Sequence, residues 1–271
     1  MATIRQVNTE DFFSRHPVFS LDQATAILKP QGGRSGMVER LKHHLKKGRL
    51  KRVAREIYAV VPLGGNPDLF KPDPYLIAVA TRPSAVFSYA SALELLGVAH
   101  AVCHHHTLFC DRRRVPIELP GVRIQFMEHP RQLRKNNMEL LGTQQVERLG
   151  QLLRVTGPER TLLEGFRRLD LVGGAEAFME SVSGLPVLDL DLIFSVLEQY
   201  KMAVLWGVAG WFLELYQRDF HVPDAFLRRL ESHRPRGAHY LLRQRPAGKL
   251  VPRWNMVLPP GIAKRGESNA D

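Results

Sequence analysis

The stretch LKKGRLKRVAREIYAV, residues 45–60, decides how the first part of this chain folds. After Gly48 its apolar residues change from a period of 3.6 to a period of 2, which predicts a helix followed by a β-hairpin that turns near residues 54–56. So much positive charge on folded structure points to a polyanionic partner. The basic residues of the stretch are Lys46, Lys47, Arg49, Lys51, Arg52 and Arg55.

Two helices are predicted before the hairpin. Ser20 can cap the first, with Gln23 reaching back from the third helical position, and this helix stops before Pro30. The second covers about residues 35–47 and exits at Gly48. On this second helix the core-facing arc, about 100° wide, consists of Met37, Val38, Leu41 and Leu45.

Helix, turn, helix and basic hairpin in this order predict a winged helix-turn-helix that binds DNA. The outer face of the second helix would read bases, while the hairpin would lie along phosphates. A merely solvated basic face is the alternative, but charge, periodicity and element order agree on DNA binding. His44, at the edge of the apolar arc, is expected to pack. The expected base contacts are Ser35, Glu39, Arg40 and His43, and the expected phosphate contacts are Arg34, Lys47, Lys51, Arg52 and Arg55.

The whole chain of 271 residues is large enough for two domains. A Pro- and Gly-rich stretch from Pro62 to Pro74 separates a winged-helix domain, residues 1–62, from residues 63–271. The net charge is +11, and the excess lies in the first 62 residues, with twelve Lys or Arg against five Asp or Glu. The expected fold class is α+β, a winged helix-turn-helix followed by a mixed α/β domain. The expected later elements are helices over 74–82, 88–96, 188–200 and 203–217, a helix opening at Pro158, and strands over 104–110, 121–128 and 254–258.

No apolar signal core follows Met1, and the run Met202–Tyr216 is too short for a bilayer span of about 20 residues. We therefore expect a cytoplasmic protein with no membrane partner. The two cysteines, seven positions apart on one expected strand, would face opposite ways, so a local disulfide is not expected.

One segment, CHHHTLFC (residues 103–110), has metal-ligand chemistry. His104, His106 and Cys110 would share a face of a strand and could ligate zinc, but no fourth ligand is evident. A partly exposed strand beside a basic turn is the preferred interpretation, so neither a metal nor a cofactor is expected. The residues 158–161 could form an active-site loop, but Pro at a first helical position favours a structural helix start.

Five segments together resemble the AbiEi family of bacterial type IV antitoxins. Besides residues 45–60 they are FSYASALELLGV (87–98), VTGPERTLLEGF (155–166), VAGWFLELY (208–216) and RWNMVL (253–258). The resemblance implies a winged helix that represses its own operon and an α/β domain that counteracts a nucleotidyltransferase-like toxin. Binding to an inverted repeat would require a dimer or two cooperating monomers.

The chain departs from the family pattern at two positions. Glu56 stands where the family commonly has Gly, so we expect a longer or differently built hairpin turn, because Glu does not tolerate a positive φ as Gly does. Glu164 stands where the family usually has Asp, which keeps the charge. The segment 228–253 is also richer in Arg than the family would suggest, and it could be a solvated tail or a nucleic-acid contact.

Two other functions are considered. A nuclease fused to a winged helix needs clustered carboxylates with a Lys two residues after an acid, yet none of the 27 acidic residues has this spacing. The sequence also lacks a phosphate-binding Gly-x-x-x-x-Gly-Lys loop, so an enzyme is not expected. A module that docks a protein partner directly is the other alternative.

Overall fold

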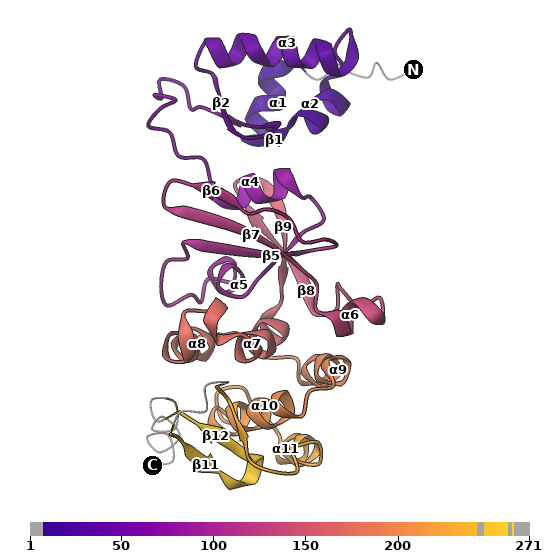
Figure 1. Ribbon diagram of the computed structural model, residues 1–271, viewed down its shortest axis with the longest axis vertical. Helices are drawn as coiled ribbons and strands as arrows, with labels where there is room; N and C mark the ends of the chain where they lie inside the picture. The colour runs from indigo at the N-terminus through magenta and orange to yellow at the C-terminus, as the bar shows by residue number, and fades with distance from the viewer. Residues whose placement is uncertain (1–7, 243–246, 260–261, 263–271) are drawn as a thin grey trace. The chain divides into compact units, whose positions relative to one another are not determined.

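The structure is a computed structural model that describes residues 8–242, 247–259 and 262. These residues form eleven α-helices and three β-sheets, a mixed α/β protein (Figure 1). The chain divides into two compact units. One comprises Met1–Ala85, Val115–Gln125 and Glu147–Leu153; the other comprises Val86–Arg114, Phe126–Val146 and Arg154–Asp271.

The N-terminal part of the first unit combines three helices with a small antiparallel sheet, in the strand order β1-β3-β2. The helices cover one side of this sheet (Figure 1). The second and third helices and the hairpin agree with the prediction from the sequence, whereas the first helix and the strand that pairs with β3 were not predicted. The elements are α1 (Thr9–Arg15), β1 (Val18–Ser20), α2 (Leu21–Leu28), α3 (Gly33–Lys46), β2 (Leu50–Ala54) and β3 (Ile57–Val60).

Local contacts explain the start of α2 and the close approach of the preceding turn to α3. The Ser20 hydroxyl accepts a hydrogen bond from the Gln23 backbone N–H at 3.1 Å, which confirms the expected cap. The Gln23 side chain does not complete a capping box, because its Nε2 lies 3.2 Å from Nδ1 of His16 instead. The first turn of α3 needs glycine at position 36, because a Cβ there would lie 2.0 Å from the Gln31 carbonyl oxygen of the preceding turn.

The expected apolar stripe of α3 faces the core of this unit. Met37 and Leu41 are fully buried, whereas Val38 and Leu45 are half-buried at its margin. The aromatic rings of Phe13 and Phe19 stack 5.7 Å apart beneath them. This packing leaves the opposite face of α3 to solvent.

The hairpin turn is not longer, contrary to one of the two expected consequences of Glu56. Ala54 pairs with Ile57, so only Arg55 and Glu56 form the turn. Glu56 takes a left-handed backbone with φ of 61°, at a cost of about 1 kcal/mol for a residue with a Cβ. A register shift between Arg52 and Ala54 adjusts the strands to this turn.

A six-stranded mixed sheet follows, in the order β6-β7-β5-β4-β9-β8. β4 runs antiparallel to β5 and parallel to β9. Strands β5 and β7 agree with the prediction from the sequence, whereas the β8–β9 pair was not predicted. The strands are β4 (Val86–Ser88), β5 (His105–Cys110), β6 (Ile117–Leu119), β7 (Val122–Glu128), β8 (Thr143–Arg148) and β9 (Gln151–Thr156), and the short helices are α4 (Pro74–Thr81), α5 (Ala90–Leu95) and α6 (Arg131–Lys135).

The second unit continues with helices around an aromatic core and closes with a small sheet of order β10-β12-β11. Gly210 of α10 is needed there, because a Cβ would lie 2.0 Å from the ring of Trp254. The expected late strand begins at Met256 rather than at Trp254, since Asn255 takes a left-handed φ of 51°. The elements are α7 (Pro158–Arg167), η1 (Leu169–Leu171), α8 (Gly174–Ser183), α9 (Leu190–Tyr200), α10 (Ala203–Leu215), α11 (Asp224–Glu231), β10 (His239–Tyr240), β11 (Lys249–Val251), η2 (Pro252–Trp254) and β12 (Met256–Leu258).

Candidate nucleic-acid interface

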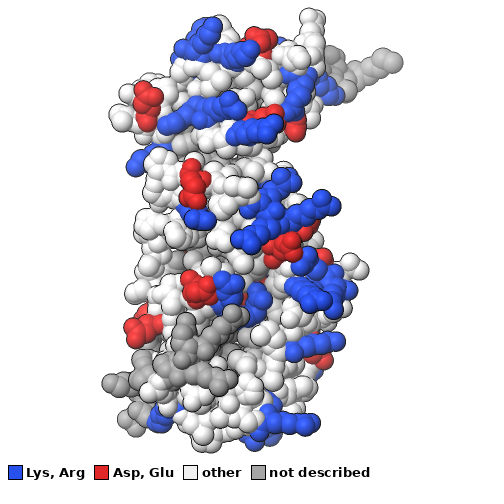
Figure 2. All heavy atoms as spheres, viewed as in Figure 1, with Lys and Arg blue, Asp and Glu red and all other residues white. Residues whose placement is uncertain are grey.

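The solvent face of α3 presents the polar side chains that the sequence analysis selected for base contacts. This face lies opposite the buried Met37 and Leu41, so its side chains are exposed to solvent. Figure 2 shows Lys and Arg side chains over this part of the molecule, with acidic side chains among them. The exposed residues of the face are Arg34, Ser35, Glu39, Arg40, His43 and Lys47.

The charges on this face are not equivalent. Glu39 is paired with Lys42 at 2.7 Å, an exposed contact between neighbouring turns of the helix. Within the described part of the chain, no ion pair involves Arg40 or Lys47. Their positive charges are therefore the ones most fully available to an external anion.

Arg34 is held by two carboxylates instead of standing free. Its guanidinium pairs with Glu56 of the hairpin turn at 2.7 Å and also contacts Asp22 of α2. The hydrogen bond to Glu56 raises the pKa of Arg34, and attraction to Asp22 adds to this. The acid in the turn thus joins the hairpin to the start of α3 and neutralises part of the expected phosphate contact.

The three basic residues expected on the hairpin also differ in how accessible their charges are to a ligand. Lys51 is half-buried, and its ammonium donates a hydrogen bond to the Phe70 carbonyl oxygen at 2.8 Å. Arg52 and Arg55 are exposed, although Nε of Arg52 lies 3.4 Å from the Ala54 carbonyl oxygen. Arg52 and Arg55 are therefore better placed for a ligand than Lys51.

His44 contacts the core of the first unit, in the way that its position on the helix suggested. Its ring lies edge-on to Phe13 with centroids 5.0 Å apart, and it is half-buried. Burial lowers the pKa of His44, and repulsion from His43 lowers it further. This side chain supports α3 from below while His43 stays on the exposed face.

Several arginines of the segment 228–253 are engaged in contacts within the second unit. Arg253 pairs with Glu231 at 3.0 Å and also contacts Glu214, and Arg234 pairs with Glu231 at 3.1 Å. The guanidinium of Arg229 lies over the Phe194 ring at 3.4 Å. Arg253 thereby joins η2 to α10 and α11, and Arg229 joins α11 to α9. Residues 243–246 of the segment lie outside the described residues.

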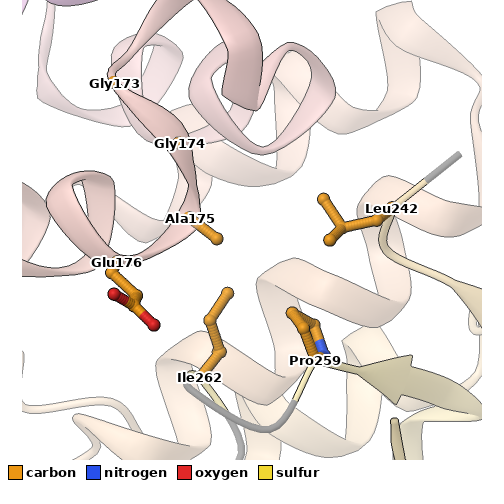
Figure 3. A pocket seen from close by; sticks show the side chains of 7 residues that line it. All are labelled: Gly173, Gly174, Ala175, Glu176, Leu242, Pro259 and Ile262. Carbon is orange, nitrogen blue, oxygen red and sulfur yellow. The ribbon is translucent and has the colours of Figure 1, made fainter. Parts of the chain in front are cut away.

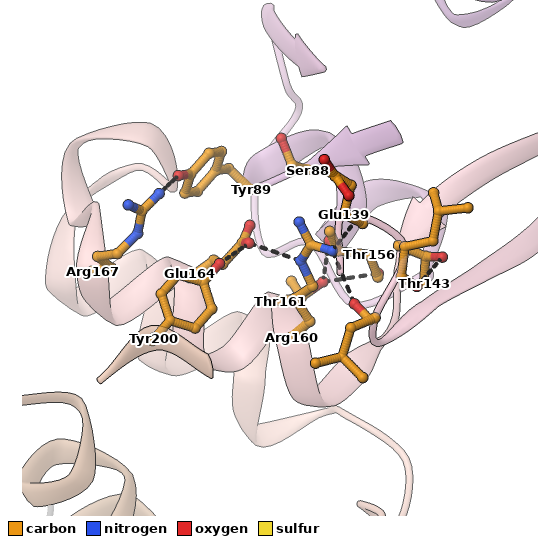
Figure 4. A network of polar contacts seen from close by, with 12 residues as sticks. Ser88, Tyr89, Glu139, Thr143, Thr156, Arg160, Thr161, Glu164, Arg167 and Tyr200 are labelled. Atoms are coloured by element: carbon orange, nitrogen blue, oxygen red, sulfur yellow. Dashed lines mark hydrogen bonds and ion pairs between the residues drawn. The ribbon is translucent and has the colours of Figure 1, made fainter. Parts of the chain in front are cut away.

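The residues 158–161 form the start of α7, as the proline suggested. Two of them, Arg160 and Thr161, belong to a buried polar network (Figure 4). The Arg160 guanidinium is fully buried and donates from Nε to Glu164 at 2.8 Å. Tyr200 donates its hydroxyl to the same carboxylate, and Arg167 donates to the Tyr89 hydroxyl at 2.7 Å. Burial, followed by repulsion from Glu164, raises the pKa of Tyr89 to about 12, so this hydroxyl keeps its proton at neutral pH.

The three residues whose spacing could suit zinc, His104, His106 and Cys110, do not form one group in the structure. His104 is exposed and precedes β5, whereas His106 and Cys110 are buried within it. The Cys110 thiol donates to the Arg112 carbonyl oxygen at 2.9 Å. Both cysteines are free thiols, as expected, but Cys103 lies before the strand rather than on it.

One pocket of the second unit, about 310 Å³ in volume, opens beside the start of α8 (Figure 3). Gly173 and Gly174 contribute backbone to its wall, and among the described residues that line it Glu176 has the one titratable side chain. A larger hollow of about 650 Å³ borders Arg167, Arg168 and Asp170. There Arg168 and Asp170 are paired with each other at 2.7 Å.

The described residues thus define a mixed α/β protein whose N-terminal helices carry an exposed basic face. A similar fold occurs in the crystal structure of RV2827C protein from Mycobacterium tuberculosis, with a TM-score of 0.55. That alignment covers 96% of this chain and 92% of the other at 15% sequence identity, so it shows a shared fold alone. No family model and no curated protein matches the sequence.

Proposed function

We propose that residues 8–61 form a winged helix-turn-helix and that the chain is a DNA-binding repressor. The observation that carries the proposal is the exposed polar face of α3, held over a closed apolar core and next to a short basic hairpin. In such domains the second helix of the helix-turn-helix motif, here α3, enters the major groove. There Arg reads guanine, and other polar side chains read base edges. Arg40 is the strongest candidate for base reading on this face.

The hairpin would serve as the wing. Arg52 and Arg55 are exposed near its tip and would bind the phosphate backbone, together with Lys47 at the end of α3. Arg34 would bind phosphate only while still paired with Glu56, which weakens its attraction to the anion, or after its ion pair with Glu56 breaks. Sequence selectivity would therefore come from α3 and general affinity from the wing.

The resemblance to the AbiEi antitoxins extends the proposal to the biological role. On that basis the chain represses its own operon and counteracts a nucleotidyltransferase-like toxin, with double-stranded operator DNA as its partner. The second unit, built around the aromatic core of α7–α11, would act against the toxin. Among the described residues no helix has the length and apolarity that crossing a membrane requires.

Fluorescence anisotropy tests the DNA-binding proposal with the full chain. The DNA just upstream of the gene is compared with a scrambled duplex between 50 and 200 mM salt. We expect tighter binding to the upstream DNA, and a loss of about 1–3 kcal/mol of this preference in Arg40→Ala. Lys47→Ala should weaken both duplexes and reduce the salt slope by about one unit.

Arg218→Ala is the matched control, because Arg218 is an exposed arginine of the second unit. Its affinity should equal that of the unchanged protein. Equal binding to both duplexes, or unchanged affinity in both α3 variants, would refute the assignment of α3. Nicking of a plasmid in Mg²⁺ or Mn²⁺ would favour the nuclease alternative instead, and copurification with the neighbouring gene product would show direct toxin contact.

A further inference from the structure

Three side chains with metal-ligand chemistry meet where α5 and β5 come together in the second unit. They are Glu94 on α5, Cys103 in the connecting segment and His106 on β5. One ligand atom from each lies within 4.8 Å of the other two. Cys103 and His106 are 9% and 2% exposed, and Glu94 is half-buried. Glu94 is therefore the most exposed of the three side chains.

Backbone contacts hold Cys103 in place beside its neighbours. Its N–H donates to the Glu94 carboxylate at 3.3 Å, and its thiol donates to the His105 carbonyl oxygen at 3.2 Å. The Ser91 hydroxyl lies 3.9 Å from the same sulfur and accepts a hydrogen bond from the Thr107 N–H at 2.9 Å. The group is thus positioned by both α5 and β5 before any ligand arrives.

We propose that Glu94, Cys103 and His106 bind one divalent transition-metal ion of the zinc type. A thiolate, an imidazole and a carboxylate suit zinc, whereas magnesium and calcium prefer all-oxygen sites. The thiolate and the carboxylate together neutralise a dication, so the bound group carries no net charge into the protein interior.

Binding replaces the Cys103 thiol proton, which leaves to solvent, by the metal. Three protein ligands leave a fourth tetrahedral position, and water can occupy it because Glu94 is partly exposed. The ion would fasten the end of α5 to the start of β5, across the connecting segment of residues 96–104.

Cobalt(II) is the probe for this site, because a cobalt–thiolate bond gives a charge-transfer absorption band. The full-length protein is stripped with a chelator and titrated with Co²⁺. We expect one equivalent to bind with this band, and added Zn²⁺ to abolish it by displacement. Cys110→Ser should keep the band, because Cys103 is then the one thiol left of the two in the chain.

Variants of the ligands and of a near neighbour locate the ion. Cys103→Ser should lose the band, and His106→Ala and Glu94→Gln should weaken binding by at least about 100-fold. His104→Ala, the control on the neighbouring exposed histidine, should bind as the unchanged protein does. Absence of the band in both the unchanged protein and Cys110→Ser would overturn the proposal, and so would a band that survives in Cys103→Ser. The Cys110→Ser result decides the matter even if Cys103→Ser fails to fold.

Discussion

The buried pair of Arg160 and Glu164 provides the sharpest test of the energetics of the second unit. Both side chains are fully buried, and their ion pair spans 2.8 Å. Arg160 also donates from Nη1 to the carbonyl oxygens of Glu139 and Leu141, at 2.7 and 2.9 Å. Burial by itself would lower the pKa of Arg160, but attraction to Glu164 and then Tyr200 outweighs it and raises the pKa. The Arg160 guanidinium is therefore charged, and the Glu164 carboxylate compensates this charge in the protein interior.

Replacing Glu164 by Gln keeps the shape of the side chain and removes its charge. Two charges about 4 Å apart attract by about 4 kcal/mol at an effective dielectric constant of about 20. Removing one partner of a buried pair costs about 3–5 kcal/mol, because the other charge is left uncompensated. We expect Glu164→Gln to lose this much free energy of unfolding. The double variant Arg160→Met, Glu164→Leu should recover only part of the loss: no buried charge remains, but the carbonyl oxygens of Glu139 and Leu141 and the Tyr200 hydroxyl lose these partners.

Urea denaturation followed by tryptophan fluorescence measures this loss, because all three tryptophans of the chain lie in the second unit. Glu128→Gln is the control: Glu128 pairs with Arg134 at the same 2.8 Å, but its side chain is 43% exposed. An exposed pair contributes about 0–1 kcal/mol, so this variant should change little. A loss for Glu164→Gln no larger than for Glu128→Gln would refute the reasoning.

Three other perturbations have defined outcomes. Glu56→Gly should raise the midpoint of thermal unfolding, because it relieves about 1 kcal/mol of left-handed backbone strain. It should also tighten DNA binding at low salt, because the substitution removes an acid from the basic face. Weaker binding in the anisotropy assay would contradict this expectation. Burial, with repulsion from Arg160, lowers the pKa of His129 from 6.5. Below about pH 6.5 the unfolded state therefore binds more protons than the folded state, so the free energy of unfolding should fall as the pH drops. This fall should be less steep in His129→Gln. Gly210→Ala should cost about 1–3 kcal/mol in urea denaturation through overpacking against Trp254, whereas Gly237→Ala, with open space around it, should cost little.

Much of the first unit could be predicted because its signals are local. The Ser20 hydroxyl caps α2 through a contact three residues away, and the apolar stripe of α3 follows from helical spacing alone. The hairpin could be placed from its change of period. The strand β1 could not, because its three residues pair with β3 about 40 positions later, and nothing local marks a strand that short.

The sequence predicted which residues of the candidate interface are exposed, but not which of them form ion pairs or hydrogen bonds with other segments. Which residues of α3 are exposed follows from the helix period, and the structure leaves all the selected ones outside the core. That Arg34 is held by Glu56, or that Lys51 binds the Phe70 carbonyl, depends on how separate segments meet. Sequence spacing contains no information of that kind.

What the sequence by itself determined was the run of two helices and a hairpin in residues 20–60, the basic excess there and the helix that opens at Pro158. Only the tertiary structure decided that Arg160 and Glu164 are buried together, because α7 is covered on all sides and not along one stripe. The tertiary structure also decided which ligand-type side chains lie near His106. These are Glu94 and Cys103, not His104 and Cys110 as strand spacing suggested. The physical reason is common to both: periodicity fixes which side chains share a face of one element, whereas contacts between elements depend on how those faces pack.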